Sequence, residues 1–215
     1  MSSNPLHRSR EVPPRLVPVP DTVSTQMQAI IAQPLDPSFN RTPETIADWK
    51  ARVAKAADST ASMLPALRQT LGVNVEQTTI SGVNAYIVIP KSTPSNRLDR
   101  VLMHLHGGCR VLNPGVAGTR EAILMAGLTG FKVISVDYRM PPDFPFPAAL
   151  DDAIAVYRHV LRTAKAGNVG IFGTSAGGSL TITTLLRAKL EGLPMPGAIA
   201  PGTPTVDLTK TGDSL

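Results

Sequence analysis

Residues 169–178 read VGIFGTSAGG, and this stretch decides the fold. Val169 to Phe172 is a short apolar run, which is typical of a buried strand. The next five residues fit G-x-S-x-G, a pattern that places a serine on a sharp turn between a strand and a helix and needs small neighbours around it. Residues 176–191 continue as a helical pattern. The stretch therefore predicts strand, turn and helix, with Ser175 exposed above a sheet.

Short apolar runs and helical patterns alternate along the rest of the second half of the chain. Strands are predicted at 73–80, 83–89, 101–105, 132–137, 169–172 and 198–201, and helices at 119–128, 147–165 and 176–191. The first two strands are separated by Ser81-Gly82, which is typical of a tight hairpin. Strands that are joined through helices form parallel sheets, so the pattern predicts an α/β fold.

The N-terminal third differs from this pattern. Five prolines within residues 1–20 predict an extended arm, because proline fixes φ and lacks an N–H group. Ser24 is a candidate N-cap for a short helix. Thr42 is the predicted N-cap of a second helix, and a separate helical run over 62–71 is predicted to end at Gly72.

A loop with two glycines directly follows the predicted strand 101–105. It reads His106-Gly107-Gly108-Cys109-Arg110. A serine that attacks an acyl group needs fixed N–H donors aimed at the negative oxygen that develops, and small residues let the backbone approach that oxygen. The N–H of Ala176, the residue after the serine, would complete such an oxyanion hole. The two segments together indicate acyl-transfer chemistry.

The composition excludes several other classes of protein. The chain has 215 residues, of which 42% are hydrophobic, enough for one sizeable domain. Its net charge is +5, but the basic residues are scattered and only 4% of residues are aromatic, so no nucleic-acid surface is predicted. No apolar run could span a membrane and no secretory signal is recognisable. The single cysteine fits a reducing compartment, and we expect a cytoplasmic location.

Three blocks of the sequence together resemble one family. They are His106-Gly107-Gly108, Asp137-Tyr138-Arg139 with the prolines and Phe146 that follow, and Gly173 to Gly178. In order, spacing and context they resemble the hormone-sensitive-lipase-like serine esterases of the α/β-hydrolase superfamily, and GTSAG resembles one bacterial subgroup. The resemblance implies an α/β-hydrolase fold, with a mostly parallel sheet, helices on both faces and an N-terminal helical cap. It divides the chain into an arm and cap helices, 1–71, and an incomplete core, 72–215.

The resemblance also implies the roles of the site residues. Ser175 is the expected nucleophile. The expected oxyanion hole comprises Gly107, Gly108, Cys109 and Ala176, in which the last three donate their N–H groups, and the His106 side chain supports the loop. The substrate is a small ester, and no cofactor is expected.

Two residues of the glycine loop depart from the family pattern. Cys109 stands where the family usually has a third glycine, and Arg110 where it usually has an aromatic residue. Cysteine still has a backbone N–H group, so the donor survives if the local φ is negative. At positive φ the added Cβ would cost about 1 kcal/mol and could misalign the donor. Arg110 would place a charge beside a pocket that is normally apolar.

Several residues near these motifs are expected to have structural roles. Asp137-Tyr138-Arg139 is interpreted as a rigid, hydrogen-bonded connection, and Thr174 as a local hydrogen-bonding residue. His104, His106 and Cys109 could suggest a metal site, but no adjacent carboxylate completes it, so no metal is predicted. Cys109 is not expected to act as a nucleophile because no later histidine could activate it.

The catalytic triad is incomplete in this sequence. In α/β hydrolases the acid and the histidine follow the serine, yet His7, His104, His106 and His159 all precede Ser175. The later acids are Glu191, Asp207 and Asp213, and none is assigned as the triad acid. The resemblance also implies about eight strands, of which the last are missing here, so the strand at 198–201 should be an edge open to aggregation or to pairing with a second copy.

Three explanations of this deficit stay open, and each bears on function. The sequence is the N-terminal portion of a longer esterase, which we prefer, or a natural short product, or one of two chains that complete each other. The predicted function is hydrolysis of short- to medium-chain carboxylic esters through an acyl-enzyme, with little turnover by this chain alone. The alternative is a non-enzymatic ligand-binding or interaction protein on a hydrolase scaffold.

Overall fold

The computed structural model describes residues 13–35, 37, 41–207 and 209, and the chain forms two compact units, Met1–Thr42 and Pro43–Leu215. In the first unit, residues 13–20 form neither helix nor strand, as the prolines predict. The helix α1 (Thr25–Ile31) follows, and the Ser24 side chain accepts a hydrogen bond from the N–H of Met27 at 3.2 Å. This confirms the predicted cap.

The second unit begins with one long helix, which corrects the prediction of two separate ones. The helix α2 (Ile46–Leu71) runs through Pro65 without a break and ends at Gly72, whose φ of 61° matches the predicted C-terminal cap. Its N-cap is Thr45 and not Thr42. Thr45 has an acid three residues further on, Asp48, and the two form a reciprocal capping box. Thr42 is followed at that spacing by Thr45, which cannot return the bond as a carboxylate does.

In the part of the chain that the structure describes, six strands form a single sheet in the order β1-β2-β4-β3-β5-β6. They are β1 (Val73–Ile80), β2 (Val83–Pro90), β3 (Val101–Leu105), β4 (Lys132–Val136), β5 (Val169–Thr174) and β6 (Ala198–Gly202). The pairs β1–β2 and β2–β4 are antiparallel, and the other three pairs are parallel. Every predicted strand is confirmed to within two residues. The α/β-hydrolase fold with a mostly parallel sheet is thereby confirmed.

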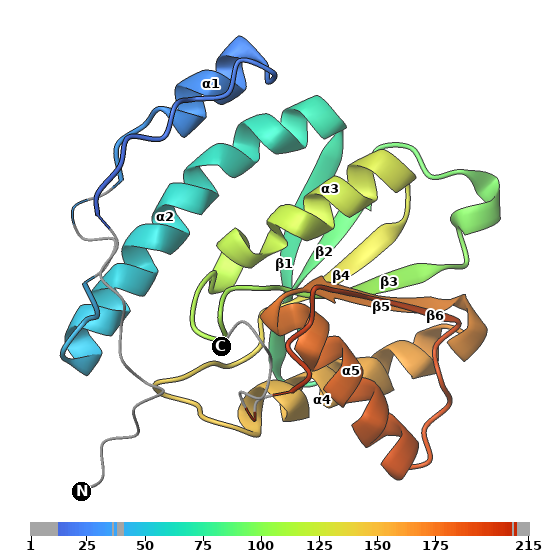
Figure 1. The fold of residues 1–215 in the computed structure, drawn as a ribbon. Coiled ribbons are helices and arrows are strands. Elements are labelled where there is room, and N and C mark those ends of the chain that lie inside the picture. Colours follow the sequence, from blue (N-terminus) through green and yellow to red (C-terminus); the bar gives the residue numbers. More distant parts are fainter. Residues whose placement is uncertain (1–12, 36, 38–40, 208, 210–215) are drawn as a thin grey trace, which may run out of the picture. The chain divides into compact units, whose positions relative to one another are not determined.

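Helices cover both faces of this sheet (Figure 1). On one face, α3 (Arg120–Thr129) lies against β1, β2 and β4, with α2 packed beside it. On the other face lie α4 (Ala148–Thr163) and α5 (Ala176–Leu190), of which α5 contacts β3, β5 and β6. Short 3₁₀ turns also lie between these elements, and the described ones are η2 (Ser95–Arg97), η3 (Gly115–Thr119) and η4 (Ala166–Asn168). Within the described residues, no helix is long and apolar enough to cross a membrane.

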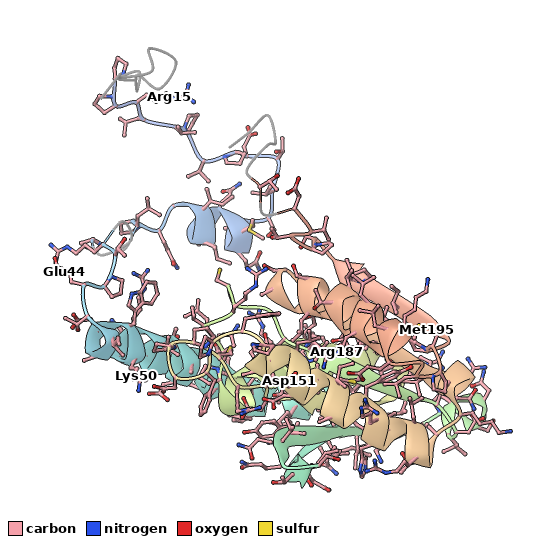
Figure 2. All side chains as sticks on the ribbon, turned by 90° about the horizontal axis from the view of Figure 1, so that it is seen from below. Arg15, Glu44, Lys50, Asp151, Arg187 and Met195 are labelled. Atoms are coloured by element: carbon pink, nitrogen blue, oxygen red, sulfur yellow. The ribbon has the colours of Figure 1, made fainter. Side chains whose placement is uncertain are left out.

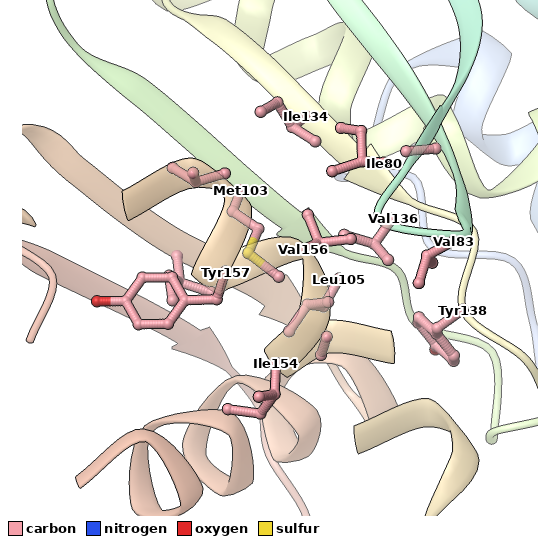
Figure 3. Packing of buried hydrophobic residues seen from close by; sticks show 14 of the residues in the cluster. Ile80, Val83, Met103, Leu105, Ile134, Val136, Tyr138, Ile154, Val156 and Tyr157 are labelled. Atoms are coloured by element: carbon pink, nitrogen blue, oxygen red, sulfur yellow. The ribbon is translucent and has the colours of Figure 1, made fainter. Parts of the chain in front are cut away.

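Each face of the sheet has its own apolar core. Under α4, the fully buried side chains of Met103, Leu105 and Tyr157 pack with Val136 and Val156, as Figure 3 shows. Burying each such side chain contributes about 1.5–3 kcal/mol. The smaller cluster on the other face joins α2 and α3 to the sheet. The strands β3 and β5, which lead to the two candidate site loops, are therefore held from both sides.

The boundary between the two compact units does not coincide with the predicted division at residues 71 and 72. Leu64 of α2 is 2% exposed and packs with Val73 and Ile123, so α2 belongs to the same unit as the sheet. At residue 127, an added Cβ would lie only 2.6 Å from the Cβ of Leu71, which shows how closely α2 approaches α3. That α2 acts as a cap over a substrate stays a prediction.

The strand β6 forms one edge of the sheet. Among the described residues it pairs only with β5, and Ile199 within it is 45% exposed. Met195, labelled in Figure 2, lies just before β6 and is 41% exposed. The predicted exposed edge is confirmed, whereas its use in pairing with a second copy stays a prediction.

Candidate active site

Ser175 lies on a strained turn between β5 and α5. Its φ of 58° and ψ of −119° fall outside the regions that a non-glycine residue ordinarily adopts. The residue is exposed, and α5 begins at the next position, Ala176. This is the sharp strand-to-helix turn that G-x-S-x-G predicts, here called the nucleophile turn after the role that the sequence predicts for Ser175, and in such a turn the serine hydroxyl is exposed above the carboxyl end of the sheet.

The glycines on either side of Ser175 are required because the backbones of two segments touch there. A Cβ on Gly173 would lie 2.1 Å from the carbonyl oxygen of Leu105, and a Cβ on Gly177 would lie 1.9 Å from the same atom. Leu105 is the last residue of β3. The sequence motif thus allows the turn after β5 to pack directly against the end of β3.

The glycine loop after β3 reaches the nucleophile turn in the same way. A Cβ on Gly107 would lie 2.6 Å from the carbonyl oxygen of Thr174 and 3.6 Å from the Cβ of Ser175. The structure therefore brings together the serine and the loop that the sequence predicts as its oxyanion hole.

Hydrogen bonds fix the direction of two peptide groups in this loop. The carbonyl oxygen of Gly107 lies 2.9 Å from His106 Nδ1 and accepts from Asn113 Nδ2 at 3.0 Å. The carbonyl oxygen of Gly108 accepts from the N–H groups of Val111 and Leu112. Because C=O and N–H point in opposite directions in a planar trans peptide, the N–H groups of the following residues, Gly108 and Cys109, point away from these partners.

Three N–H groups near the serine are without a protein acceptor. Within the described part of the chain, the N–H groups of Gly108, Cys109 and Ala176 donate to no other group. Ala176 is also the first residue of α5, where the helix dipole adds positive potential. An oxygen that becomes negative beside Ser175 could accept these bonds, which supports the predicted oxyanion hole.

His106 is buried between the glycine loop and Tyr138. It is 3% exposed, and its ring stacks on Tyr138 with centroids 4.3 Å apart, while the Tyr138 hydroxyl donates to the carbonyl oxygen of His106 at 2.6 Å. Burial lowers the pKa of His106 to about 4, against a weaker opposing effect of the carbonyl of Gly107. The neutral ring carries its proton on Nδ1, since Gly107 O can only accept. Its Nε2 has no partner among the described residues.

Cys109 and Arg110 both have positive φ, at 53° and 67°. The family glycine at position 109 would adopt this conformation without strain, whereas cysteine cannot. The two departures from the family pattern therefore lie on a strained part of the loop. Cys109 is an exposed free thiol.

Replacing Cys109 by glycine should relieve this strain. We expect Cys109→Gly to raise the free energy of unfolding by up to about 1 kcal/mol, because the positive φ no longer opposes a Cβ. Urea denaturation measures the change. The control is Cys109→Ala, which also removes the thiol but keeps the Cβ. An equal gain in the alanine variant would show that φ is not the cause.

The segment after β4, Asp137-Tyr138-Arg139, forms the hydrogen-bonded connection that the sequence predicts. Asp137 accepts a hydrogen bond from the N–H of Gly115 at 2.8 Å. Arg139 binds the buried carboxylate of Asp152 through both its Nε and its Nη2 atoms. Bidentate pairs of this kind fix geometry as well as charge. This network fixes the position of Tyr138, whose ring stacks on His106, and the guanidinium group of Arg139 is bound to Asp152.

Glu121 lies at the site although no sequence motif predicts it there. It lies on α3, accepts from the hydroxyl of Thr174, and its other oxygen lies 3.2 Å from His104 Nε2. Burial raises the pKa of Glu121, but the hydrogen bonds from His104 and Thr174 outweigh this effect and lower it overall. The expectation that no carboxylate adjoins His104 was wrong. Glu121 and Thr174 are 53 positions apart, and no local pattern links them.

This carboxylate completes a hydrogen-bonded network and not a metal site. His104 is fully buried, and its Nδ1 lies 2.9 Å from the hydroxyl of Ser135. Within the described residues no group of three His, Cys, Asp or Glu side chains could hold a metal ion. The network ties Thr174, the neighbour of Ser175, to α3 and β4.

No histidine of the described part of the chain hydrogen-bonds to Ser175. His104 and His106 are engaged as above, and His159 pairs with Arg162 on α4. Of the later acids, Glu191 binds Arg187 and Arg158, and Asp207 accepts from the N–H of Thr209. His7 and Asp213 lie outside the described residues.

Two cavities adjoin the nucleophile turn. The first, here the Ser175 cavity, has a volume of about 380 Å³ and is lined by Ser175, Gly107, Glu121 and neighbouring residues. The second, here the Arg110 cavity, has a volume of about 300 Å³ and is lined by Ala176, Arg110, Phe144, Leu180 and other mainly apolar residues. Pockets of this size suit small organic ligands, for which about 300–1,000 Å³ is usual.

A known family shares this arrangement. Over residues 102–215, more than half of the chain, the sequence matches the family described as alpha/beta hydrolase fold, and the chain belongs to that family. The resemblance to hormone-sensitive-lipase-like esterases is confirmed by the relatives and solved structures that the chain matches.

Among solved structures, the esterase E25 superposes with a TM-score of 0.83 at 37% identity, over 96% of this chain and 64% of that one. A hormone-sensitive-lipase homologue from a metagenome library, EstE7, superposes with a TM-score of 0.63 at 32% identity, over 77% of this chain and 57% of that one.

Curated relatives match over shorter stretches. The acetyl-hydrolase of Streptomyces hygroscopicus is 34% identical over 122 residues, which are 56% of this chain and 41% of that protein. The hormone-sensitive lipase of Bos taurus is 31% identical over 127 residues, which are 57% of this chain and 16% of that protein. The chain thus spans less than half the length of these two relatives.

Proposed function

We propose that this chain carries the nucleophile and the oxyanion hole of a serine carboxylesterase acting on short- to medium-chain esters. The observation that carries the proposal is the contact between two segments: the strained turn at Ser175 lies against the glycine loop whose free N–H groups belong to Gly108 and Cys109. The naming of the relatives as esterases and an acetyl-hydrolase supports the same chemistry.

The reaction follows from the geometry. The Oγ of Ser175 attacks the ester carbonyl, and the carbonyl oxygen becomes negative where the N–H groups of Gly108, Cys109 and Ala176 can bind it. The C–O bond to the alcohol breaks, the alcohol leaves with a proton, and the acyl group stays on Ser175. Water then attacks the acyl-enzyme, which releases the acid and restores the serine hydroxyl.

Turnover also needs a base that takes the proton from Ser175. Because no imidazole of the described residues is bonded to that hydroxyl, we propose that the chain by itself turns over slowly. Loss of the histidine base from a serine hydrolase costs several powers of ten in rate. A reagent with a good leaving group needs a single attack by Ser175 and no deacylation, so its reaction tests the nucleophile without requiring turnover.

Labelling with a fluorophosphonate probe tests the nucleophile. We expect the chain to be phosphonylated at Ser175, because the oxyanion hole stabilises the charged phosphonyl oxygen, and we expect Ser175→Ala to remain unlabelled. Mass spectrometry of the intact protein and of its peptides identifies the site. The matched control Ser62→Ala, on the exposed face of α2, should label like the unmodified chain. Labelling at another residue would contradict the assignment.

A p-nitrophenyl butyrate assay tests the missing base. We expect release of p-nitrophenol to stop near one equivalent per chain, since the acyl-enzyme is hydrolysed slowly. Full turnover by the monomer would overturn the proposal that the base is absent. If neither reagent modifies Ser175, the alternative gains support: a non-enzymatic ligand-binding or interaction protein on a hydrolase scaffold.

A further inference from the structure

The Arg110 cavity combines an apolar wall with one charge. Its lining includes the rings of Tyr138, Phe144 and Phe146 and the side chains of Leu150 and Leu180. Among the described residues that line it, Arg110 is the one charged side chain. Arg110 is exposed, so its charge stays hydrated until a ligand covers it, and a purely hydrocarbon ligand would give the guanidinium group no partner in place of that water.

The guanidinium group of Arg110 is available to a ligand. None of the ion pairs between described residues involves Arg110. The contrast with Arg139 is clear, because that side chain is held by the carboxylate of Asp152. Burial raises the pKa of Tyr138, and the charge of Arg110 opposes this effect, so the guanidinium lies within electrostatic reach of the cavity wall.

The Arg110 cavity also adjoins the residues of the candidate active site. Ala176 contributes to its lining and supplies a free N–H beside the nucleophile. Arg110 follows Cys109, whose N–H is another of the free donors, directly in the chain. One ligand could therefore place its ester beside Ser175 and a second group against Arg110.

We propose that the Arg110 cavity selects esters that carry a carboxylate on a short apolar chain, such as monoesters of dicarboxylic acids, and that Arg110 determines this specificity. The inference rests on the proposed function. Guanidinium groups bind carboxylates through paired hydrogen bonds, and the apolar wall excludes water and strengthens the attraction. The aromatic and leucine side chains contact the methylene groups of the substrate.

Binding without reaction tests the cavity first. Isothermal titration of the full chain with hexanoate and with 1-hexanol compares two ligands of equal chain length, one charged and one neutral. We expect hexanoate to bind at least about tenfold more tightly, because one good charged contact contributes this much. In Arg110→Met the two affinities should become similar, and in Arg110→Lys an intermediate preference should remain.

The matched control is Arg100→Met. It removes the same charge at the opposite end of β3 and should keep the preference for hexanoate. Equal binding of the two ligands by the unmodified chain, or a preference that Arg110→Met leaves unchanged, would overturn the inference.

Acylation rates test the same preference on the ester itself. We expect mono-p-nitrophenyl glutarate to acylate Ser175 about tenfold faster than p-nitrophenyl pentanoate, and Arg110→Met to abolish the difference. Equal rates in the unmodified chain would overturn the selection of charged esters. If neither ester acylates Ser175, the proposed function fails, and the titrations still decide whether the cavity binds carboxylates.

Discussion

Gly177→Ala should unfold at much lower urea concentration than the unmodified chain and should lose labelling of Ser175. The added Cβ would lie 1.9 Å from the carbonyl oxygen of Leu105 and 2.7 Å from that of His106. Both contacts are with backbone, which no side-chain rotation can relieve. Overpacking of this kind costs up to about 3 kcal/mol and occasionally more, and we expect this variant to reach at least that figure.

The control for this substitution is Gly167→Ala. Gly167 lies in η4, and an added Cβ there meets nothing within 4 Å. Because both variants make the same change of residue type, the difference between their free energies of unfolding reports mainly the clash. A loss in Gly177→Ala within about 0.5 kcal/mol of that in Gly167→Ala, the usual range for neutral substitutions, would contradict the contact between β3 and the nucleophile turn.

The core of the site could be predicted from the sequence because its determinants are local. The turn at Ser175 depends on neighbouring glycines, and the loop after β3 depends on Gly107 and Gly108. The glycines of each motif stand close together in the sequence and can be recognised there, although the contacts that require them are made with the other segment. The strands could be predicted for the same reason, since alternation and β-branched composition act within a few residues.

The course of α2 could not be predicted because a tertiary contact overrides a local signal. Pro65 lacks an N–H and disfavours the interior of a helix. The helix nevertheless continues to Leu71, since Leu64, directly before that proline, and Leu71, at the end of the helix, both pack against α3 and its surroundings. Burial of such side chains offsets the cost of about 3 kcal/mol that an interior proline carries.

The role of Glu121 was hidden for a related reason. Its partners, His104 and Thr174, lie on two different strands, and only the parallel pairing of β3 with β5 brings them to one helix.

The conformation at Cys109 was left open by the sequence, since a residue type does not fix the sign of φ in a loop. The structure gives a positive φ, so the donor at this position is held under strain.

Acidification should destabilise the folded chain through His106. Burial lowers the pKa of this imidazole from 6.5 to about 4 in the folded state. Below pH 6.5 the unfolded chain therefore binds a proton that the folded chain does not accept. The free energy of unfolding falls as the pH drops from about 6.5 to about 4 and then levels off, with a total loss of roughly 3 kcal/mol from this group.

Urea denaturation at several pH values between about 6.5 and 4 measures this loss of stability. Comparing the unmodified chain with His106→Phe isolates the contribution of His106. Phenylalanine keeps an aromatic ring on Tyr138 but cannot take a proton, so the variant should lose less stability on acidification. We expect it to be less stable than the unmodified chain at pH 7, because the hydrogen bond to the carbonyl oxygen of Gly107 is lost. His159→Gln, on α4, should keep the full fall because His106 is intact. Parallel pH profiles for His106→Phe and the unmodified chain would contradict the lowered pKa of His106 in the folded state.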